Sequence, residues 1–242
     1  MTARTRRTSR TRYRAVVTDV DGTLTGPDRR LDARAALAVR RLESRGIPVV
    51  LATGNVLPIA LALHRSLGLS GPIVAENGGL VYWQANREER VERLADRRVA
   101  LRAFRALRDA GLPVRRLFTD RWRETEVALV PNVSIARIRR ALAGEPIRVA
   151  SIGTGYAIHL MEAGTGKLPA LRRALLPLGL TPSDCVVLGD GDNDAAMLRA
   201  SGFGVSFASG SPAARRAARY VTRRSFGAGF VEGLKASGLY PR

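Results

Sequence analysis

Four polar clusters in the sequence combine residue types that could carry out chemistry on a phosphoryl group. They are Asp19-Val20-Asp21-Gly22-Thr23, Thr53-Gly54-Asn55, Lys167, and Asp190-Gly191-Asp192-Asn193-Asp194. Carboxylates crowded into one site repel each other strongly unless a cation lies among them. Oxygen-only ligands favour Mg²⁺, which prefers octahedral geometry and keeps several waters. The clusters therefore predict a magnesium site, if the fold brings them together.

Each cluster has a role in phosphoryl transfer. Asp19 can attack phosphorus with one carboxylate oxygen and form an acyl phosphate. Asp21 can protonate the leaving alcohol and later activate a water molecule. Thr53 and the ammonium group of Lys167 would hold phosphoryl oxygens, as would the backbone N–H groups of the glycine-rich turn after Asp19. Asn193 could orient the metal loop or a substrate oxygen.

Taken singly, these motifs have other interpretations. Asp and Gly suit ordinary turns at strand ends, and Gly189 to Asp194 could be a calcium loop, although it lacks the glutamate of an EF-hand. Gly164 to Lys167 resembles the end of a P-loop, but Met161 and Leu168 occupy positions where that motif needs Gly and Ser or Thr. Lys167 favours phosphate chemistry, because it is one of only two lysines among 40 basic residues.

The elements expected around these clusters form an α/β fold. Short apolar runs predict strands, and apolar residues at helical spacing predict the helices between them. The strands are expected at Ala15–Thr18, Ile47–Ala52, Pro72–Ala75, Cys185–Leu188, Phe203–Ser206 and Tyr220–Thr222, and the helices at Leu31–Arg45, Pro58–Leu67 and Leu168–Leu178. This alternation predicts a parallel sheet, and ligands bind beyond the carboxyl ends of such strands. The clusters would converge there.

The middle third of the chain predicts a different, α+β module. Strands are expected at Leu80–Trp83, Val114–Phe118, Glu126–Val130, Ile147–Ser151 and Ala157–Leu160, with a long charged helix at Arg87–Ala110 and a short one at Ser134–Ala143. His159 is interpreted as a packed side chain rather than a lining of the site, and Trp83 and Trp122 as core of this module. We therefore expect a basic tail at 1–12, a catalytic core at 13–80 and 160–242, and an inserted cap at 81–159.

In order and context, the four clusters resemble the four motifs of the haloacid dehalogenase superfamily. The resemblance implies a Rossmann-like parallel-sheet core and a cap of the Cof-like and sucrose-phosphatase-like branch. It implies that Asp19 is the nucleophile and Asp21 the general acid and base. It also implies that Asp19, Asp21 (through its carbonyl), Asp190 and Asp194 surround Mg²⁺. Thr53, Gly54, Lys167 and Asn193 are expected to bind the substrate.

Within that branch, the stretch from Leu51 to Pro58 and the run Glu76-Asn77-Gly78-Gly79 are similar to archaeal-type phosphoglycolate phosphatases. This similarity implies a phosphatase that converts 2-phosphoglycolate to glycolate and phosphate. A sugar-phosphate phosphatase or a mannosyl-3-phosphoglycerate phosphatase of the same superfamily is the alternative.

The formal net charge of +19 raises the remote alternative of a nucleic-acid-binding protein. The arginines are spread along the chain, and RNA-binding signatures and zinc-finger spacing are missing, so we expect no nucleic-acid partner. Arginine use this strong indicates a GC-rich genome or life at high temperature.

The lone Cys185 and the lack of an apolar run of about 18 residues predict a soluble, cytoplasmic protein. The oligomeric state stays open, with a homodimer as one option.

Overall fold

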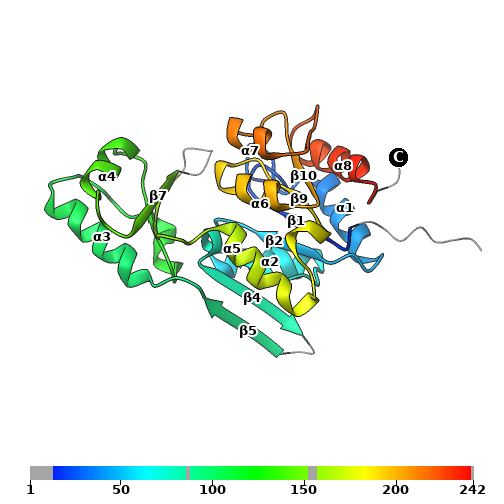
Figure 1. The fold of residues 1–242 in the computed structure, drawn as a ribbon, viewed down its shortest axis with the longest axis horizontal. Coiled ribbons are helices and arrows are strands. Elements are labelled where there is room, and N and C mark those ends of the chain that lie inside the picture. Colours follow the sequence, from blue (N-terminus) through cyan, green and yellow to red (C-terminus); the bar gives the residue numbers. More distant parts are fainter. Residues whose placement is uncertain (1–12, 86–87, 152–156, 241–242) are drawn as a thin grey trace, which may run out of the picture.

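The computed structural model describes residues 13–85, 88–151 and 157–240, so the basic tail at 1–12 lies outside the described residues. One eight-stranded sheet dominates it (Figure 1). In spatial order its strands are β11 (Tyr220–Val221), β10 (Phe203–Ser206), β9 (Cys185–Leu188), β1 (Ala15–Thr18), β2 (Val49–Ala52), β3 (Ile73–Ala75), β4 (Leu80–Ala85) and β5 (Glu88–Arg93). The first six are parallel, whereas β4 and β5 are antiparallel to their neighbours.

Helices cover both faces of this sheet, which is why its central strands are continuous apolar runs. The helices are α1 (Ala33–Glu43), α2 (Leu57–Leu67), α5 (Lys167–Leu175), α6 (Ala195–Ala200), α7 (Pro212–Ala217) and α8 (Phe226–Ser237). Buried residues of α1, α2 and α8 pack on one face, and those of α5, α6 and α7 pack on the other. The result is the expected α/β core with a parallel sheet between two helical layers.

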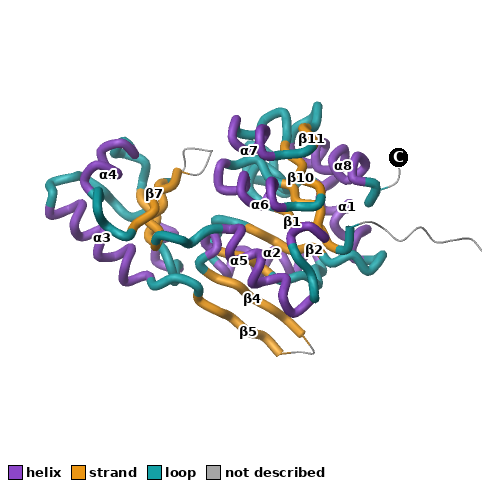
Figure 2. The backbone as a smooth tube through the Cα atoms, viewed as in Figure 1, coloured by secondary structure: helices purple, strands orange, loops and turns teal. Residues whose placement is uncertain are grey.

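A second, three-stranded antiparallel sheet forms a separate layer, seen at the left of Figure 2. Its strands run in the order β6 (Val127–Leu129), β8 (Ile158–Glu162) and β7 (Ile147–Ser151). Helices α3 (Arg97–Asp109) and α4 (Ile135–Ala141) pack on it around their own apolar cluster. Among the described residues, no helix is both long and apolar enough to cross a bilayer.

The expected long helix at Arg87–Ala110 is wrong in its first part. Residues 88–93 form β5, which pairs with β4 in the register Tyr82↔Val91, and the helix α3 begins only after its N-cap Asp96. The strand expected at Val114–Phe118 is also wrong, because that segment makes one isolated bridge and leads into a 3₁₀ turn at Phe118–Trp122. Within that turn, the buried Asp120 accepts a hydrogen bond from the N–H of Ala128.

Two strands of the structure bear on the expected domain boundaries. A boundary after Leu80 would cut β4, and one after His159 would cut β8. Strands β4 and β5 continue the core sheet, and Trp83 packs against the core helices instead of the cap. We therefore propose that the inserted cap extends from about residue 94 to residue 162.

Candidate active site

Asp19 stands at the carboxyl end of the central strand β1, and its backbone N–H donates to the carbonyl of Leu188 on β9 (3.0 Å). The Nζ atom of Lys167, at the first position of α5, lies 2.6 Å from Oδ1 of Asp19 and 2.7 Å from Oδ1 of Asp194. All three side chains are buried. Residues separated by 148 positions in the chain therefore share one charged contact.

Three carboxylates converge at this contact. Oxygen atoms of Asp19, Asp190 and Asp194 lie within 4.8 Å of one another. Burial raises the pKa of Asp19 well above its ordinary value, and the charge of Asp194 adds to this effect against the lowering by Lys167. Burial and then the charge of Asp194 raise the pKa of Asp190 to about 7.

Burial acts to lower the pKa of Lys167, but the charges of Asp19 and Asp194 outweigh it and raise this pKa, so the ammonium group stays charged. One ammonium group still does not balance three carboxylates. A divalent cation would remove the remaining repulsion, and an all-oxygen donor set suits Mg²⁺. The residues present therefore fit the predicted metal site. Asp21 is outside this side-chain cluster, and metal ligation through its carbonyl stays a prediction.

The side chain of Asp21 is directed to two other polar groups. Its Oδ2 accepts from Nδ2 of Asn55 (2.7 Å), and its Oδ1 lies 3.7 Å from a guanidinium nitrogen of Arg29. Asn55 belongs to one of the four clusters, but sequence reasoning assigned it no role of its own. Its amide fixes the orientation of the carboxylate that is expected to transfer protons.

The loop after β1 approaches the metal cluster closely. Gly22 has a φ of +82°, and a Cβ atom there would lie 2.3 Å from Oδ2 of Asp190. The hydroxyl of Thr23 contacts Oδ1 of the same Asp190 at 3.3 Å. Glycine is thus required at position 22 both by its conformation and by the space available.

The second motif, Thr53-Gly54-Asn55, makes hydrogen bonds through its backbone. Thr53 is buried, and its Oγ1 accepts from the N–H of Asn55 (3.0 Å), which leaves its hydroxyl hydrogen available as a donor. The carbonyl of Gly54 accepts a hydrogen bond from Arg123 of the inserted module (3.0 Å). Substrate binding by Thr53 and Gly54 stays a prediction.

Asn193 is hydrogen-bonded to Asn77, with its Nδ2 3.0 Å from Oδ1 of Asn77. The Nδ2 of Asn77 in turn lies 3.0 Å from Oε2 of Glu126 and 3.3 Å from Nδ1 of His159. Asn77 has a φ of +55°, in a region that asparagine tolerates better than most residues. A direct contact of Asn193 with substrate stays a prediction.

We call Asn77, Arg123, Glu126 and His159 the bridging cluster, because it connects the metal loop and the second motif to the inserted module. Arg123 contacts Glu126, and Nδ1 of His159 lies 2.9 Å from Oε1 of Glu126. Burial acts to raise the pKa of Glu126, but the charges of His159 and Arg123 outweigh it and hold this pKa at about 2. The buried His159 thus contacts both Glu126 and Asn77, and it is a packed side chain as expected.

Sequence reasoning missed Asn77, Arg123 and Glu126 as members of a site. A signal was present, since Glu126 directly precedes the apolar run Val127–Val130, and a buried carboxylate needs a partner. Glu76 is a second buried carboxylate that contacts the inserted module. It has a φ of +49° and accepts hydrogen bonds from the N–H (2.9 Å) and the hydroxyl (2.7 Å) of Thr125.

Comparisons with known proteins agree with this geometry. A family model described as haloacid dehalogenase-like hydrolase matches residues 16–122 and 131–233. A phosphoglycolate phosphatase of Methanopyrus kandleri is 38% identical over 224 residues, which cover 91% of this chain and 95% of that protein. One from Methanothermobacter thermautotrophicus is 37% identical and covers 92% of this chain and 97% of its own.

Among solved structures, the protein 0175 of Thermoplasma acidophilum superposes with a TM-score of 0.84 at 25% identity. The match covers 94% of this chain and 99% of the Thermoplasma chain. The core sheet and the inserted module are therefore both shared with that protein.

Proposed function

The chain belongs to the haloacid dehalogenase-like hydrolase family, and from that premise we propose that it hydrolyses 2-phosphoglycolate to glycolate and phosphate. It is a phosphoric monoester hydrolase with an α/β core of the Rossmann-like type found in this family. The proposal adds the substrate, a requirement for Mg²⁺, and a covalent intermediate on Asp19.

The geometry around Asp19 carries the mechanistic part of the proposal. Lys167 contacts one carboxylate oxygen of Asp19 at 2.6 Å, which leaves the other oxygen to attack phosphorus. As the new bond from this oxygen to phosphorus forms, the bond from phosphorus to the ester oxygen breaks. Asp21 donates a proton to that oxygen, so that the alcohol leaves neutral.

The second step returns the enzyme to its starting state. Asp21, now ionised, accepts a proton from a water molecule whose oxygen attacks the phosphorus of the acyl phosphate. The bond between phosphorus and Asp19 breaks, and phosphate and the carboxylate are released. A magnesium ion held by Asp19, Asp190 and Asp194 would supply positive charge that stabilises the phosphoryl oxygens throughout.

The substrate part is supported by the relatives at 37% and 38% identity, both named phosphoglycolate phosphatase and both matched along more than nine tenths of their length. The alternative substrates are sugar phosphates and mannosyl-3-phosphoglycerate, which the same chemistry would cleave. These esters share the phosphoryl group, so contacts outside the phosphoryl site must select among them. A panel of substrates measures that selection.

The test is phosphate release from a panel of phosphomonoesters with Mg²⁺, and again with a chelator. The panel contains 2-phosphoglycolate, mannosyl-3-phosphoglycerate, several sugar phosphates and an aryl phosphate. We expect chelator-sensitive turnover with the highest kcat/KM for 2-phosphoglycolate. A higher kcat/KM for another ester would overturn the substrate alone, whereas turnover insensitive to the chelator would overturn the metal requirement.

A further inference from the structure

The strand β5 (Glu88–Arg93) forms one outer edge of the eight-stranded sheet, and no described strand pairs with its free side (Figure 1). It is six residues long, whereas β11 at the opposite edge has only two. The free side of an edge strand presents unpaired N–H and C=O groups that can pair with another strand. A long, uncovered edge of this kind is a candidate interface.

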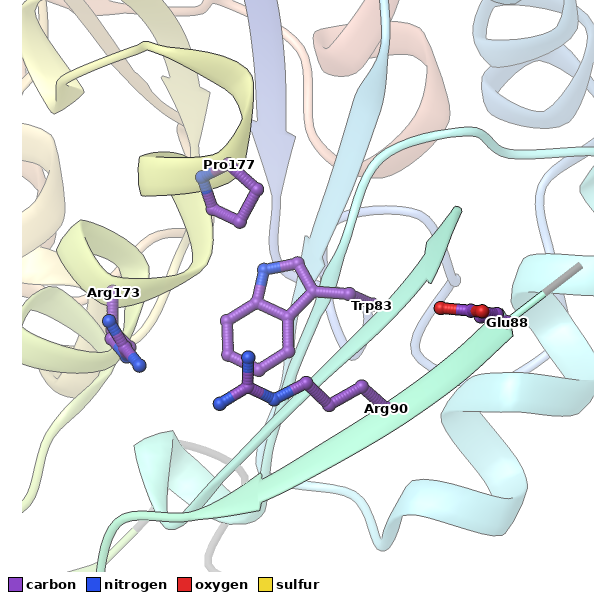
Figure 3. Close-up of a pocket in the computed structure, with 5 residues that line it drawn as sticks. All are labelled: Trp83, Glu88, Arg90, Arg173 and Pro177. Atoms are coloured by element: carbon purple, nitrogen blue, oxygen red, sulfur yellow. The ribbon is translucent and has the colours of Figure 1, made fainter. Parts of the chain in front are cut away.

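Two apolar side chains at this edge are partly exposed, although the other residues of β5 are charged. Val91 and Leu94 are 39% and 36% exposed. Beside the strand lies a cavity of about 220 Å³, lined by Trp83, Glu88, Arg90, Arg173 and Pro177 (Figure 3). In that view the guanidinium of Arg90 lies close to the indole ring of Trp83, with a separation of 5.5 Å from Cζ to the ring centroid.

The charges along β5 are complementary to those of a second copy of the strand that runs in the opposite direction. In an isologous contact across a two-fold axis, the two strands run antiparallel and one residue lies opposite its own copy. With Val91 at the axis, Glu89 of one copy is opposite Arg93 of the other, and Arg90 is opposite Glu92. The side chains of opposed residues lie on the same face of the sheet.

The alternative registers place like charges together. A two-fold axis at the edge must be perpendicular to the sheet, so each face of one copy continues into the same face of the other. The neighbouring registers that satisfy this condition have Arg90 or Glu92 at the axis. They place Arg90 opposite Arg90, or Glu92 opposite Glu92, and like charges directly opposite each other are destabilising.

We propose that β5 is a homodimer interface, in which two copies of this chain pair antiparallel about Val91 and join their sheets into one. Exposed ion pairs contribute little to affinity, so the charges select the register. The backbone hydrogen bonds and the apolar surface of Val91 and Leu94 hold the copies together. This proposal is independent of the proposed substrate and mechanism.

The four charged residues that would pair across the axis already have partners in their own chain, and this shapes the test. Arg90 lies 3.6 Å from Glu92, and Arg173 lies 3.0 Å from the same carboxylate. A double reversal of Arg90 and Glu92 in one chain would restore the contact within the chain as well as the contact between chains. Two single variants, mixed together, separate these effects.

The variants are Arg90→Glu and Glu92→Arg, studied by sedimentation velocity with one of them fluorescently labelled. Each alone places two like-charge pairs at the axis, and we expect its dimer dissociation constant to rise about tenfold to a hundredfold. In the mixture, the chain with Arg90→Glu is acidic at both positions and the chain with Glu92→Arg is basic at both, so opposite charges face each other again. We expect the mixture to form heterodimers with nearly the parent affinity.

Arg105→Glu, a charge reversal on the exposed side of α3, is the matched control and should keep the parent dissociation constant. Circular dichroism verifies that each variant is folded. The proposal is overturned by a parent protein that stays monomeric at about 100 µM. Failure of the two variants to associate with each other, or equal weakening by Arg105→Glu, would also overturn it.

Discussion

Asp19 is a carboxylate that folding places in an unfavourable position. It is buried, it lies beside Asp190 and Asp194, and these surroundings raise its pKa well above the ordinary value. Strongly perturbed groups concentrate at functional sites, so we expect Asp19 to serve chemistry and not stability. Lys167 offsets part of the repulsion and, in doing so, fixes one oxygen of the carboxylate.

Replacement of Asp19 by asparagine tests this role directly. We expect Asp19→Asn to lower kcat more than about a thousandfold, because the amide cannot form the acyl phosphate. The melting temperature of the metal-free protein should stay the same or rise, since one buried negative charge is removed. Phosphate release and thermal unfolding measure the two effects.

Asp192→Asn is the control, because Asp192 lies in the same loop as the proposed metal ligands Asp190 and Asp194 but is exposed. It should keep nearly the parent activity. Equal losses in the two variants would show that activity depends on the total negative charge around the carboxylate cluster and not on a nucleophile. Retention of activity by Asp19→Asn would remove the mechanistic proposal.

The turn that follows β3 couples the metal loop to the inserted module through the side chain of Asn77. Its amide lies between Asn193 and Glu126, at 3.0 Å from each. We expect Asn77→Gly to lower kcat about tenfold to a hundredfold and to raise the Mg²⁺ concentration needed for half-maximal activity. Glycine keeps the positive φ of this position, so the loss reports on the amide.

Asn77→Ala should show the same loss of activity with an additional destabilisation of about 1 kcal/mol, because alanine is strained at a φ of +55°. Asn132→Ala, at an exposed asparagine that bonds the carbonyl of Pro113, is the control. Magnesium titrations of activity and urea unfolding provide the measurements. A parent-like kcat and Mg²⁺ requirement in Asn77→Gly would contradict the coupling.

Glu126, directly before β6, makes the bridging cluster sensitive to acid. Its pKa is about 2 in the folded protein, below the ordinary value of 4.5. Its stabilising contribution is therefore complete above pH 4.5 and is lost as the pH falls from 4.5 toward 2. In Glu126→Gln, the free energy of unfolding should be lower by about 3 kcal/mol at pH 7, and should fall less steeply with acid.

Urea unfolding at pH 7, 4.5 and 3 measures this difference. Glu124→Gln is the matched control, since Glu124 lies two residues away and pairs with Arg93 at the surface. It should lose less than about 1 kcal/mol. The same acid dependence in Glu126→Gln and the parent would show that the low pKa of Glu126 does not stabilise the fold.

The ends of the parallel strands could be predicted from the sequence, whereas contacts between distant elements could not. Strands β1, β2, β3 and β9 are apolar runs closed by polar motifs, and such runs need no partner to be recognised. The strand β5 has one apolar residue among six, so only its pairing with β4 makes it a strand. The residue pattern of such a charged segment is equally compatible with a helix.

Some residues of the candidate site could likewise be predicted from the sequence, and others could not. Asp19, Lys167, Asp190 and Asp194 belong to motifs whose chemistry is visible in the residue types. Asn77 and Glu126 are 49 positions apart, and each is unremarkable in its local sequence. Their contact exists only because the cap segment that leads into β6 returns to the loop after β3.

The distribution of charge over the whole molecule differs from that at its centre. The chain carries a net charge of +19, yet the proposed metal site is a cluster of carboxylates. A positive surface raises the local concentration of small anions. In the proposed mechanism, the acidic centre binds a cation before it receives a phosphoryl group. The excess of arginine therefore suits the capture of a small anionic substrate.

Ionic strength separates this general attraction from the chemistry. Added salt shortens the screening length from roughly 30 Å at 0.01 M to about 10 Å at 0.1 M, so kcat/KM should fall while kcat stays nearly constant. The fall should be steeper for 2-phosphoglycolate than for an aryl phosphate, because the carboxylate adds a third negative charge to be attracted. Initial rates for both esters, measured across a salt series at fixed Mg²⁺, give the two slopes. Slopes near zero for both esters would mean that the net charge does not assist capture of the substrate, and equal non-zero slopes would mean that the carboxylate does not contribute to it. A falling kcat would mean that salt acts on the proposed metal site instead.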